Sequence, residues 1–279
     1  MTRTAILSGP ASIISPEHRL IAVIGAGGKT SLIGWIAQQR LLEQKKVIIT
    51  TTTKILPLHD VCTVLQEQGP DFPDRVYRAL NKHSRILIAR TFDTQTGKMI
   101  GLDTDIITQL HESGMADSIL VEADGAAHKP LKAPAKHEPV IPFAADICIG
   151  VMGLDAVYRP LTEANVHRHE IFSRITGLAP GELVTPADMI HIATAPNGLF
   201  KGSPPDSEQV ILLNKSDIPG SRDWIDEFES ILNDKQHLLP CKWFTGSVQQ
   251  QHLNRINHTP DPMHYSVRSR LSLSHPFQK

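Results

Sequence analysis

The chain has 279 residues, and its 41% hydrophobic content is enough to bury the core of one large α/β domain. Its formal net charge of −1 excludes a general electrostatic attraction to nucleic acid or to an anionic membrane surface. The three cysteines, Cys62, Cys148 and Cys241, are widely spaced, which excludes a disulfide scaffold or a zinc ribbon and favours buried thiols in a reduced cytoplasmic protein. No apolar run approaches the roughly 18 to 20 residues that span a bilayer. Together with the small net charge, this predicts that neither a membrane nor a nucleic acid is a partner.

The first predicted strand leads directly into a glycine-rich turn. The apolar run at residues 20–24 is followed by Gly25, Ala26, Gly27, Gly28, Lys29, Thr30 and Ser31. Glycines let backbone N–H groups curl around phosphate oxygens, and the helix that follows adds the positive end of its dipole. Lys29 adds a full charge and Thr30 offers a hydroxyl to Mg²⁺. We therefore predict that residues 25–31 bind the phosphates of a nucleoside triphosphate, either ATP or GTP.

This turn departs from the strict phosphate-loop pattern G-x-x-x-x-G-K-[ST], because Val23 stands where the first glycine belongs. Gly25 instead opens the shorter form G-x-x-G-K-[ST], which is close to the loop of Mur-type ligases. An ordinary strand-to-helix turn is the alternative interpretation. Such a turn, however, does not require a Lys-Thr pair at the start of the helix.

Helical and strand patterns alternate after this turn. An amphipathic helix to about Gln44 and a strand over residues 47–49 complete a parallel βαβ unit. Thr52, Thr53 and Lys54 follow this strand, where they either reach the γ-phosphate or its Mg²⁺ or serve only as β-forming residues. Further along, we predict a helix over residues 74–82, a strand over 86–89, a hairpin turn over 94–98 and a helix over 104–112.

An acidic motif follows the next predicted strand, over residues 118–121. This strand ends on Glu122-Ala123-Asp124-Gly125, which is an E-x-x-G pattern. In nucleoside triphosphatases the corresponding D-x-x-G supplies an acidic residue for Mg²⁺ and a glycine N–H that faces the γ-phosphate. We predict that Thr30, Glu122 and Asp124 hold Mg²⁺, and that Lys29, Glu122 and Asp124 are the catalytic residues.

Residues 126–142 are rich in proline, lysine and histidine and show no periodicity, which predicts an ordered loop or a mobile lid. Its cations could clamp a second anionic ligand or neutralise charge on a transferred phosphoryl group. They could equally be solvated loop residues. The residues concerned are Lys129, Lys132, Lys136 and His137.

A third motif follows a later strand. We predict a strand over residues 147–152, helices over 166–175 and 186–193, and a strand over 209–213. That last strand ends on Asn214-Lys215-Ser216-Asp217, the pattern [NT]-K-x-D. In this pattern the aspartate, Asp217, accepts hydrogen bonds from N1–H and the exocyclic amine of guanine, which adenine cannot supply. Asn214 and Lys215 shape the base pocket, so we predict that all three residues bind the base. The alternative is a helix cap formed by Ser216 or Asp217.

Two histidines open the first of these helices. His167 and His169 lie two residues apart, a spacing that suits neither a shared helix face nor a metal pair at positions i and i+4. A solvated surface is therefore the favoured interpretation for both.

The three motifs predict the architecture. All follow predicted parallel strands, whose carboxyl ends share one edge of a sheet. We predict a three-layer α/β fold like that of the P-loop NTPases, with a mostly parallel sheet and helices on both faces. Residues 1–247 would form this nucleotide-binding domain, including a helix over 224–232, a weak strand over 242–244 and the inserted loop 126–142. Residues 248–279 would form a poorly ordered polar tail.

The combination of E-x-x-G with N-K-x-D resembles the metallocentre-assembly GTPases, although the extra cysteine and histidine ligands of that group have no counterpart in this sequence. A closer resemblance, to the YqeC family, spans about residues 16–247. It rests on VIGAGGKTSL (23–32), VIITTTTKI (47–55), ILVEADGAAHKPLKAPAKHEPVIP (119–142) and VILLNKSD (210–217). That family is described as accessory proteins of selenium-dependent hydroxylases. The resemblance implies a P-loop-type fold and a role in the maturation of selenium-dependent molybdenum hydroxylases, with such an enzyme or its maturation proteins as a partner.

Three functions agree with these motifs. The leading hypothesis is a Mg²⁺-dependent accessory protein that hydrolyses ATP or GTP and couples its turnover to the assembly of a selenium or molybdenum centre. The second is an ATP-dependent ligase or kinase, in which a Mur-like loop passes the γ-phosphate to an acceptor at the lysine-rich segment. The third is a regulatory scaffold that binds nucleotide without hydrolysing it.

Overall fold

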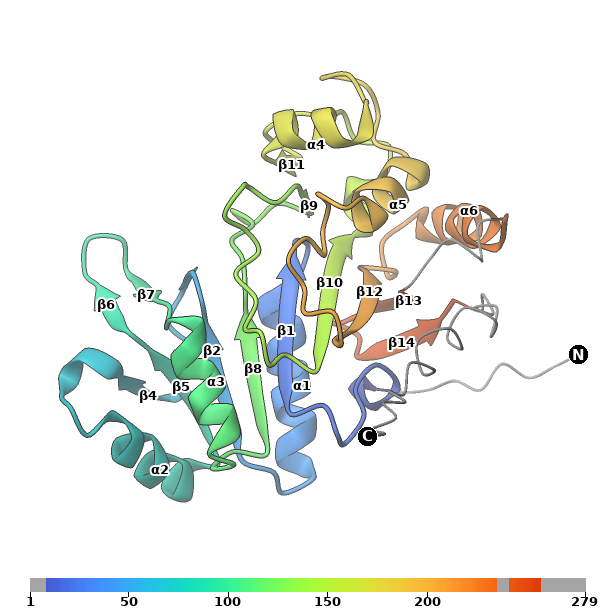
Figure 1. Cartoon of the computed structure of the whole chain (residues 1–279). Coiled ribbons are helices and arrows are strands. Elements are labelled where there is room, and N and C mark those ends of the chain that lie inside the picture. The colour runs from blue at the N-terminus through green and yellow to red at the C-terminus, as the bar shows by residue number, and fades with distance from the viewer. Residues whose placement is uncertain (1–8, 235–240, 257–279) are drawn as a thin grey trace, which may run out of the picture.

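The computed structural model describes residues 9–234 and 241–256 (Figure 1). A nine-stranded sheet has the order β14-β13-β12-β10-β1-β8-β2-β5-β4, and each neighbouring pair is parallel except β13 with β14. Its strands are β1 (Leu20–Gly25), β2 (Val47–Thr51), β4 (Cys62–Leu65), β5 (Arg85–Ala89), β8 (Ser118–Glu122), β10 (Ile147–Gly153), β12 (Glu208–Asn214), β13 (Lys242–Ser247) and β14 (His252–Arg255). The predicted α/β class with a mostly parallel sheet is confirmed.

The middle strands are buried along their whole length because helices cover both faces of the sheet. Every residue of β1, β8 and β10 is buried. In the register of these strands, Leu20 pairs with Ile119 and Ile21 pairs with Ile147. Continuous apolar runs of this kind are typical of parallel strands that pack on both sides.

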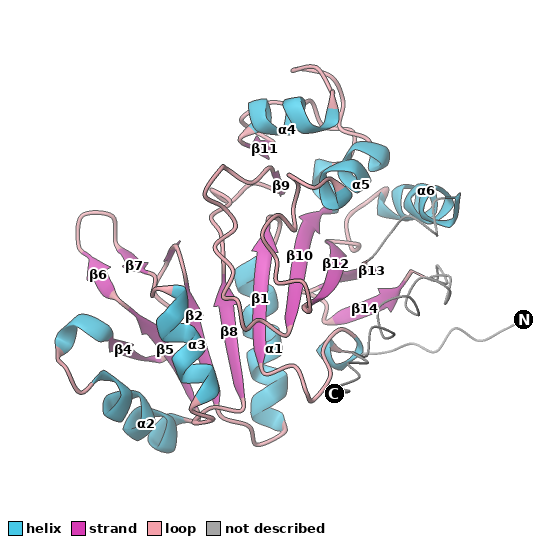
Figure 2. Ribbon diagram, in the orientation of Figure 1, coloured by secondary structure: helices cyan, strands magenta, loops and turns pink. Residues whose placement is uncertain are grey.

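The helices form two layers (Figure 2). Helix α1 packs on one face, where Ile33 and Ile36 join Ile21 and Val23 in one core. The other face carries a second core, formed with residues of the remaining helices. These helices are α2 (Phe72–His83), α3 (Thr104–Glu112), α4 (His169–Thr176), α5 (Pro186–Thr194) and α6 (Ser221–Asp234), with α1 spanning Lys29–Leu42.

Small elements complete the described chain. A three-stranded antiparallel sheet contains β3 (Lys54–Ile55), β7 (Lys98–Ile100) and β6 (Thr91–Asp93), so the predicted hairpin turn is present. A parallel two-stranded ribbon joins β9 (Leu131–Lys132) to β11 (Val166–His167). Three 3₁₀ turns are η1 (Pro10–Ser12), η2 (Gln66–Gln68) and η3 (Leu154–Ala156). Among the described helices, none has the length and apolar character needed to cross a bilayer.

Two sequence expectations differ from the structure. The helix expected from residue 166 begins at His169, because Val166–His167 pair with β9 instead. The tail expected from residue 248 contains β14, which pairs antiparallel with β13 and buries Leu253 in the sheet. Four residues are too few for a periodic pattern to be read from the sequence. The rest of the predicted tail, residues 257–279, lies outside the described residues.

The segment 126–142 is an ordered loop and contains β9. Leu131, Lys132, Ala133, Ala135 and Glu138 are all buried. A lid that opens freely would expose such residues to solvent, so this interior part is a fixed component of the fold. Of the three thiols, Cys148 and Cys241 are buried and Cys62 is half-buried.

Candidate functional site

Residues 25–31, the predicted phosphate loop, curl tightly at the carboxyl end of β1. Gly25, Gly27 and Gly28 have φ values of 91°, 83° and 131°, in the region that favours glycine. A Cβ atom would clash with the Val151 carbonyl at Gly25, with the backbone of Gly153 at Gly27 and with the Asn214 side chain at Gly28. Each glycine of the motif is therefore required by the local geometry.

The first three N–H groups of this loop already have acceptors within the protein. Gly25 N–H donates to Asp124 Oδ2 (2.9 Å), Ala26 N–H to the Val151 carbonyl (2.8 Å) and Gly27 N–H to the Lys129 carbonyl (3.1 Å). In the described part of the chain, the N–H groups of residues 28–31 make no hydrogen bond. Phosphate binding would therefore use the start of α1 first, a narrower set of donors than the whole predicted cradle.

A buried charge cluster lies next to the loop. Lys29 Nζ donates to the Gly25 carbonyl (2.8 Å) and lies 3.1 Å from Asp124 Oδ1 and 3.6 Å from Glu122 Oε1. Thr30 Oγ1 donates to Glu122 Oε2 (2.8 Å). The sequence-predicted catalytic residues and Mg²⁺ ligands therefore lie together at the carboxyl ends of β1 and β8.

The two acidic residues have different surroundings. Asp124 is 1% exposed, and its Oδ2 accepts from Gly25 N–H and lies 3.0 Å from Lys132 Nζ. Direct coordination of a metal by this oxygen would break those contacts, whereas Glu122 and Thr30 already face each other across one hydrogen bond. The described residues contain no group of three or more histidine, cysteine, aspartate or glutamate side chains that could hold a metal. Mg²⁺ needs only one or two carboxylates when phosphates and waters complete its shell, so Glu122 with Thr30 fits it.

The glycine of the E-x-x-G motif faces open space. A Cβ atom at Gly125 would have no atom within 4 Å. Its N–H makes no hydrogen bond with the residues in 9–234 and 241–256. This N–H is therefore available to an acceptor other than the described residues.

Lys132 lies beneath the acidic motif and is 1% exposed. Its Nζ contacts Asp124 Oδ2 and donates to Glu138 Oε2 (2.7 Å), and Arg168 holds the same Glu138 carboxylate in a bidentate pair (2.5 and 2.8 Å). Burial alone would raise the pKa of Glu138, but the hydrogen bond from Arg168 and the charge and hydrogen bond of Lys132 outweigh it and lower this pKa to about 2. The charge of Lys132 is therefore compensated by Asp124 and Glu138 inside the fold, which argues against both the clamp and the solvated-loop interpretation of this residue. Lys136 and His137 are exposed.

The Glu138 network gives a stability prediction. The pKa of this carboxyl falls from 4.5 in the unfolded chain to about 2 in the fold, so its contribution is complete above pH 4.5 and is lost as the pH falls toward 2. Glu138→Gln should lower the free energy of unfolding by about 3 kcal/mol at pH 7. Urea unfolding should show this difference shrinking as the pH is lowered below about 4.5. The free energy of unfolding of the exposed control Glu170→Gln should stay within about 0.5 kcal/mol of the parent value at pH 7 and below pH 4.5. An equal loss of stability in both variants would contradict the assignment.

The threonines at the end of β2 and just after it act as structural donors. Thr50 donates to the Ile88 carbonyl, Thr51 to the Glu122 carbonyl (2.7 Å) and Thr52 to the Val140 carbonyl (2.7 Å). Lys54 lies 3.6 Å from Asp93 in the small sheet. These contacts favour the structural interpretation over a role for Thr52, Thr53 and Lys54 at the γ-phosphate.

The N-K-S-D motif contacts the phosphate loop directly. Asn214 is buried, donates from Nδ2 to the Gly27 carbonyl (2.8 Å) and accepts the Val248 N–H at Oδ1 (3.0 Å). Lys215 lies 2.6 Å from Asp155 Oδ2. This asparagine therefore ties together the ends of β1, β12 and β13.

Asp217 is exposed, and its carboxylate makes no hydrogen bond with any residue in the described ranges. Helix α6 begins four residues later, at Ser221, whose hydroxyl donates to the Ser216 carbonyl. The helix-cap interpretation of Asp217 therefore has no supporting contact, and its carboxylate is available to a ligand.

A cavity of about 480 Å³ joins the two motifs. The phosphate loop and α1 contribute one wall, the N-K-S-D segment a second, and the last residue of β13 with the residues after it a third. This volume lies within the usual range for small-molecule sites. The lining includes Gly27, Gly28, Ser31, Gly34, Trp35, Asn214, Lys215, Asp217, Ser247, Val248 and Gln251.

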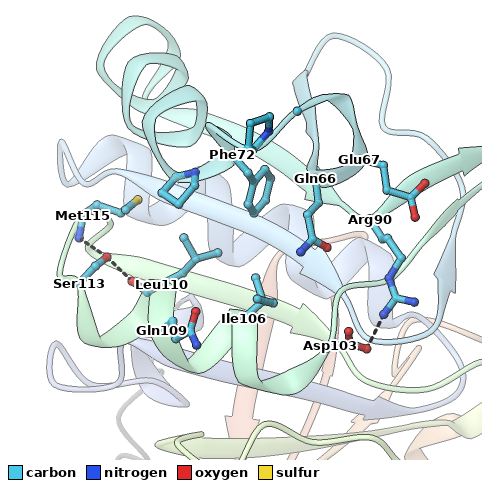
Figure 3. A pocket seen from close by; sticks show the side chains of 13 residues that line it. Gln66, Glu67, Phe72, Arg90, Asp103, Ile106, Gln109, Leu110, Ser113 and Met115 are labelled. Carbon is cyan, nitrogen blue, oxygen red and sulfur yellow. Dashed lines mark hydrogen bonds and ion pairs between the residues drawn. The ribbon is translucent and has the colours of Figure 1, made fainter.

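A larger cavity of about 770 Å³ lies elsewhere, between α2 and α3 (Figure 3). Phe72, Ile106 and Leu110 line it, with the Arg90–Asp103 ion pair at one end. None of the residues predicted from the three motifs lines this cavity, so volume alone does not identify the site.

Two parts of the site were missed by sequence reasoning. The wall formed by Ser247 and Val248 lies at the carboxyl end of a parallel strand, β13, and that position was a usable signal. Lys132 and His167 become neighbours only because β9 pairs with β11 across 35 residues of chain, in a ribbon that no local pattern predicts.

Comparisons with known proteins agree on one protein family. The sequence model of a family described as "YqeC protein" matches residues 21–170, a span that includes the phosphate loop, the E-x-x-G motif and the segment 126–142. A protein of Escherichia coli (strain K12), described as "Uncharacterized protein YqeC", is 31% identical over 236 residues, which cover 83% of this chain and 88% of that protein. The chain belongs to the YqeC family.

Proposed function

We propose that this protein binds a nucleoside triphosphate with Mg²⁺ and hydrolyses it, with guanine as the preferred base. One observation carries the proposal: a single cavity is lined both by Gly28 and Ser31, at the start of α1, and by Asp217. The Lys29, Thr30 and Glu122 cluster lies beside the same phosphate loop. A triphosphate at the loop and a purine at Asp217 would fill the two ends of this arrangement.

The residues of the cluster have separate roles in this proposal. Lys29 would leave Asp124 to bind the β- and γ-phosphates, and Thr30 with Glu122 would hold the metal. When bound, Mg²⁺ would neutralise negative charge on the phosphates. Asp124, fixed by Gly25 N–H and Lys132, would keep the loop in its curled shape. Asn214 would hold the cavity wall against Gly27.

A titration of ATP and GTP with Mg²⁺, followed by measurement of phosphate release, tests this function. We expect tighter binding of GTP and slow release of phosphate. A preference for ATP together with phosphate transfer to an added acceptor would favour the ligase or kinase, and tight binding without any hydrolysis would favour the regulatory scaffold. A role in the maturation of selenium-dependent molybdenum hydroxylases is part of the proposal, and rests on the family resemblance.

A further inference from the structure

The ribbon of β9 and β11 lies over the phosphate loop. The segment that leads into β9 is bonded to that loop and to β10, through Lys129 O to Gly27 N–H (3.1 Å) and Pro130 O to Gly153 N–H (2.8 Å). Lys132, in β9, reaches Asp124. Figure 1 shows β9 and β11 above the carboxyl ends of β1 and β10, with α4 beyond them.

The register of this ribbon determines which way His167 faces. His167 pairs with Lys132, and Val166 pairs with Leu131. Directly paired residues project from the same face of a sheet, and successive residues project from opposite faces. Since Lys132 points to Asp124 and Gly125, His167 lies on the face of the ribbon that is turned toward the acidic motif.

The imidazole of His167 is half-buried and makes no hydrogen bond with the residues that the structure describes. The charged groups around it are the cations Arg168 and Lys132 and the acids Glu138 and Asp124. Burial and then the two cations lower the pKa of His167 below its ordinary value of 6.5, against the opposing effect of the two acids. The ring is therefore neutral at pH 7 and can accept a proton.

We propose that His167 is the general base of the hydrolysis reaction, an inference that rests on the proposed function. A water oxygen would form a bond to the γ-phosphorus while the bond from that phosphorus to the bridging oxygen breaks. The electron pair of the broken bond stays on the β-phosphate of the diphosphate product. The proton of the attacking water passes to the free imidazole nitrogen and then to solvent, so atoms and charge balance.

Other histidines near this region are less suited to the role. His128 and His137 lie at exposed positions of the loop 126–142. His169 follows the ribbon by two residues and lies 3.6 Å from Glu170, an exposed acid on its own helix. His169 is therefore the matched control for His167, because it is the same residue type and lies directly on the other side of Arg168.

The first test compares His167→Gln with His169→Gln in the full chain. We expect His167→Gln to lower the rate of GTP hydrolysis by about 10²- to 10⁴-fold while the Kd for Mg·GTP changes less than about threefold. The parent kcat/KM should rise with pH through an apparent pKa below 6.5, that of the nucleotide-free protein, and this rise should be absent in His167→Gln. His169→Gln should keep the parent rate and the parent profile. A parent-like rate and pH profile in His167→Gln would overturn the proposal.

A second measurement does not depend on turnover. The His167 imidazole is titrated by NMR in the nucleotide-free chain, with Mg·GDP, and with a non-hydrolysable Mg·GTP analogue. A nearby γ-phosphate should raise its pKa with the analogue but not with GDP, and the same pKa in both complexes would overturn the proposal. If the parent binds GTP but releases no phosphate, hydrolysis as the proposed function fails, and the titration still decides whether His167 faces the γ-phosphate. If the parent binds neither nucleotide, both proposals fail.

Discussion

Replacing Lys29 with alanine should weaken the binding of Mg·GTP by about 10- to 150-fold, because a charge-assisted hydrogen bond contributes roughly 1.5 to 3 kcal/mol. The loss has a second source in this fold. Lys29 is the cation next to Asp124 Oδ1 and Glu122 Oε1, so its removal leaves two acidic groups facing the phosphates. Repulsion between like charges should move the loss toward the upper end of that range. Fluorescence titration with a labelled GTP analogue measures it.

The control for this experiment is Lys45→Ala, which removes an exposed lysine that lies 3.6 Å from Asp117. Its Kd should match that of the parent. Urea unfolding of both variants separates weaker binding from partial unfolding, because Lys29 is 4% exposed and belongs to a buried charge cluster. A folded Lys29→Ala variant with the parent Kd would show that residues 25–31 do not bind the phosphates.

The parts of the fold that could be predicted from sequence are those with a strong local pattern. The helix expected over residues 104–112 has those limits in α3, and the buried strands β1, β8 and β12 begin and end within a residue or two of the predicted limits. Continuous apolar runs flanked by polar turns suffice for such elements, since each buries both of its faces. By contrast, β11 and β14 have two and four residues and form because partner strands are available beside them.

The candidate site also contains contacts that the sequence could suggest and contacts that it could not. The contact between Thr30 and Glu122 follows from two motifs at the ends of neighbouring parallel strands, which sequence spacing alone could suggest. The burial of Lys132 could not be inferred, because its partners Asp124 and Glu138 lie 8 and 6 residues away along an irregular path. Arg168, which shares the Glu138 carboxylate, lies 36 residues away. Local composition instead predicted either an anion-binding lysine or a solvated one, and neither interpretation includes a buried ion pair. A buried ionic network is visible only when its members are brought together in space.

The acceptors of Gly25, Ala26 and Gly27 N–H form another group that sequence could not reveal. They belong to the segment just after β8, to β10 and to the loop 126–142, which are three separate parts of the chain. Because Gly27 N–H is bonded to Lys129, a phosphate oxygen that took this donor would have to displace the Lys129 carbonyl. The phosphate loop is therefore coupled to the segment 126–142, which carries Lys132 and pairs through β9 with the strand of His167.

Asp217→Asn should change the base preference of the nucleotide site from guanine to xanthine. A carboxylate accepts two hydrogen bonds, from N1–H and the exocyclic amine of guanine. An asparagine amide offers one acceptor and one donor, which match N1–H and the 2-oxo group of xanthine. We expect the Kd for GTP to rise by about 10²- to 10⁴-fold and XTP to bind more tightly than GTP. Competition of GTP, XTP and ATP against a labelled nucleotide measures all three preferences in one assay.

The control Asp223→Asn makes the same chemical change at an exposed position in the first turn of α6, and should leave the base preference of the parent unchanged. The helix-cap interpretation of Asp217 predicts another result for Asp217→Asn: asparagine caps a helix about as well as aspartate, so neither stability nor nucleotide preference would change. An adenine site predicts that ATP binds both proteins equally well. Only a carboxylate that accepts from the base gives a gain for XTP together with a loss for GTP. That reciprocal change therefore distinguishes recognition of guanine from a general loss of affinity, since a distorted cavity would weaken both nucleotides.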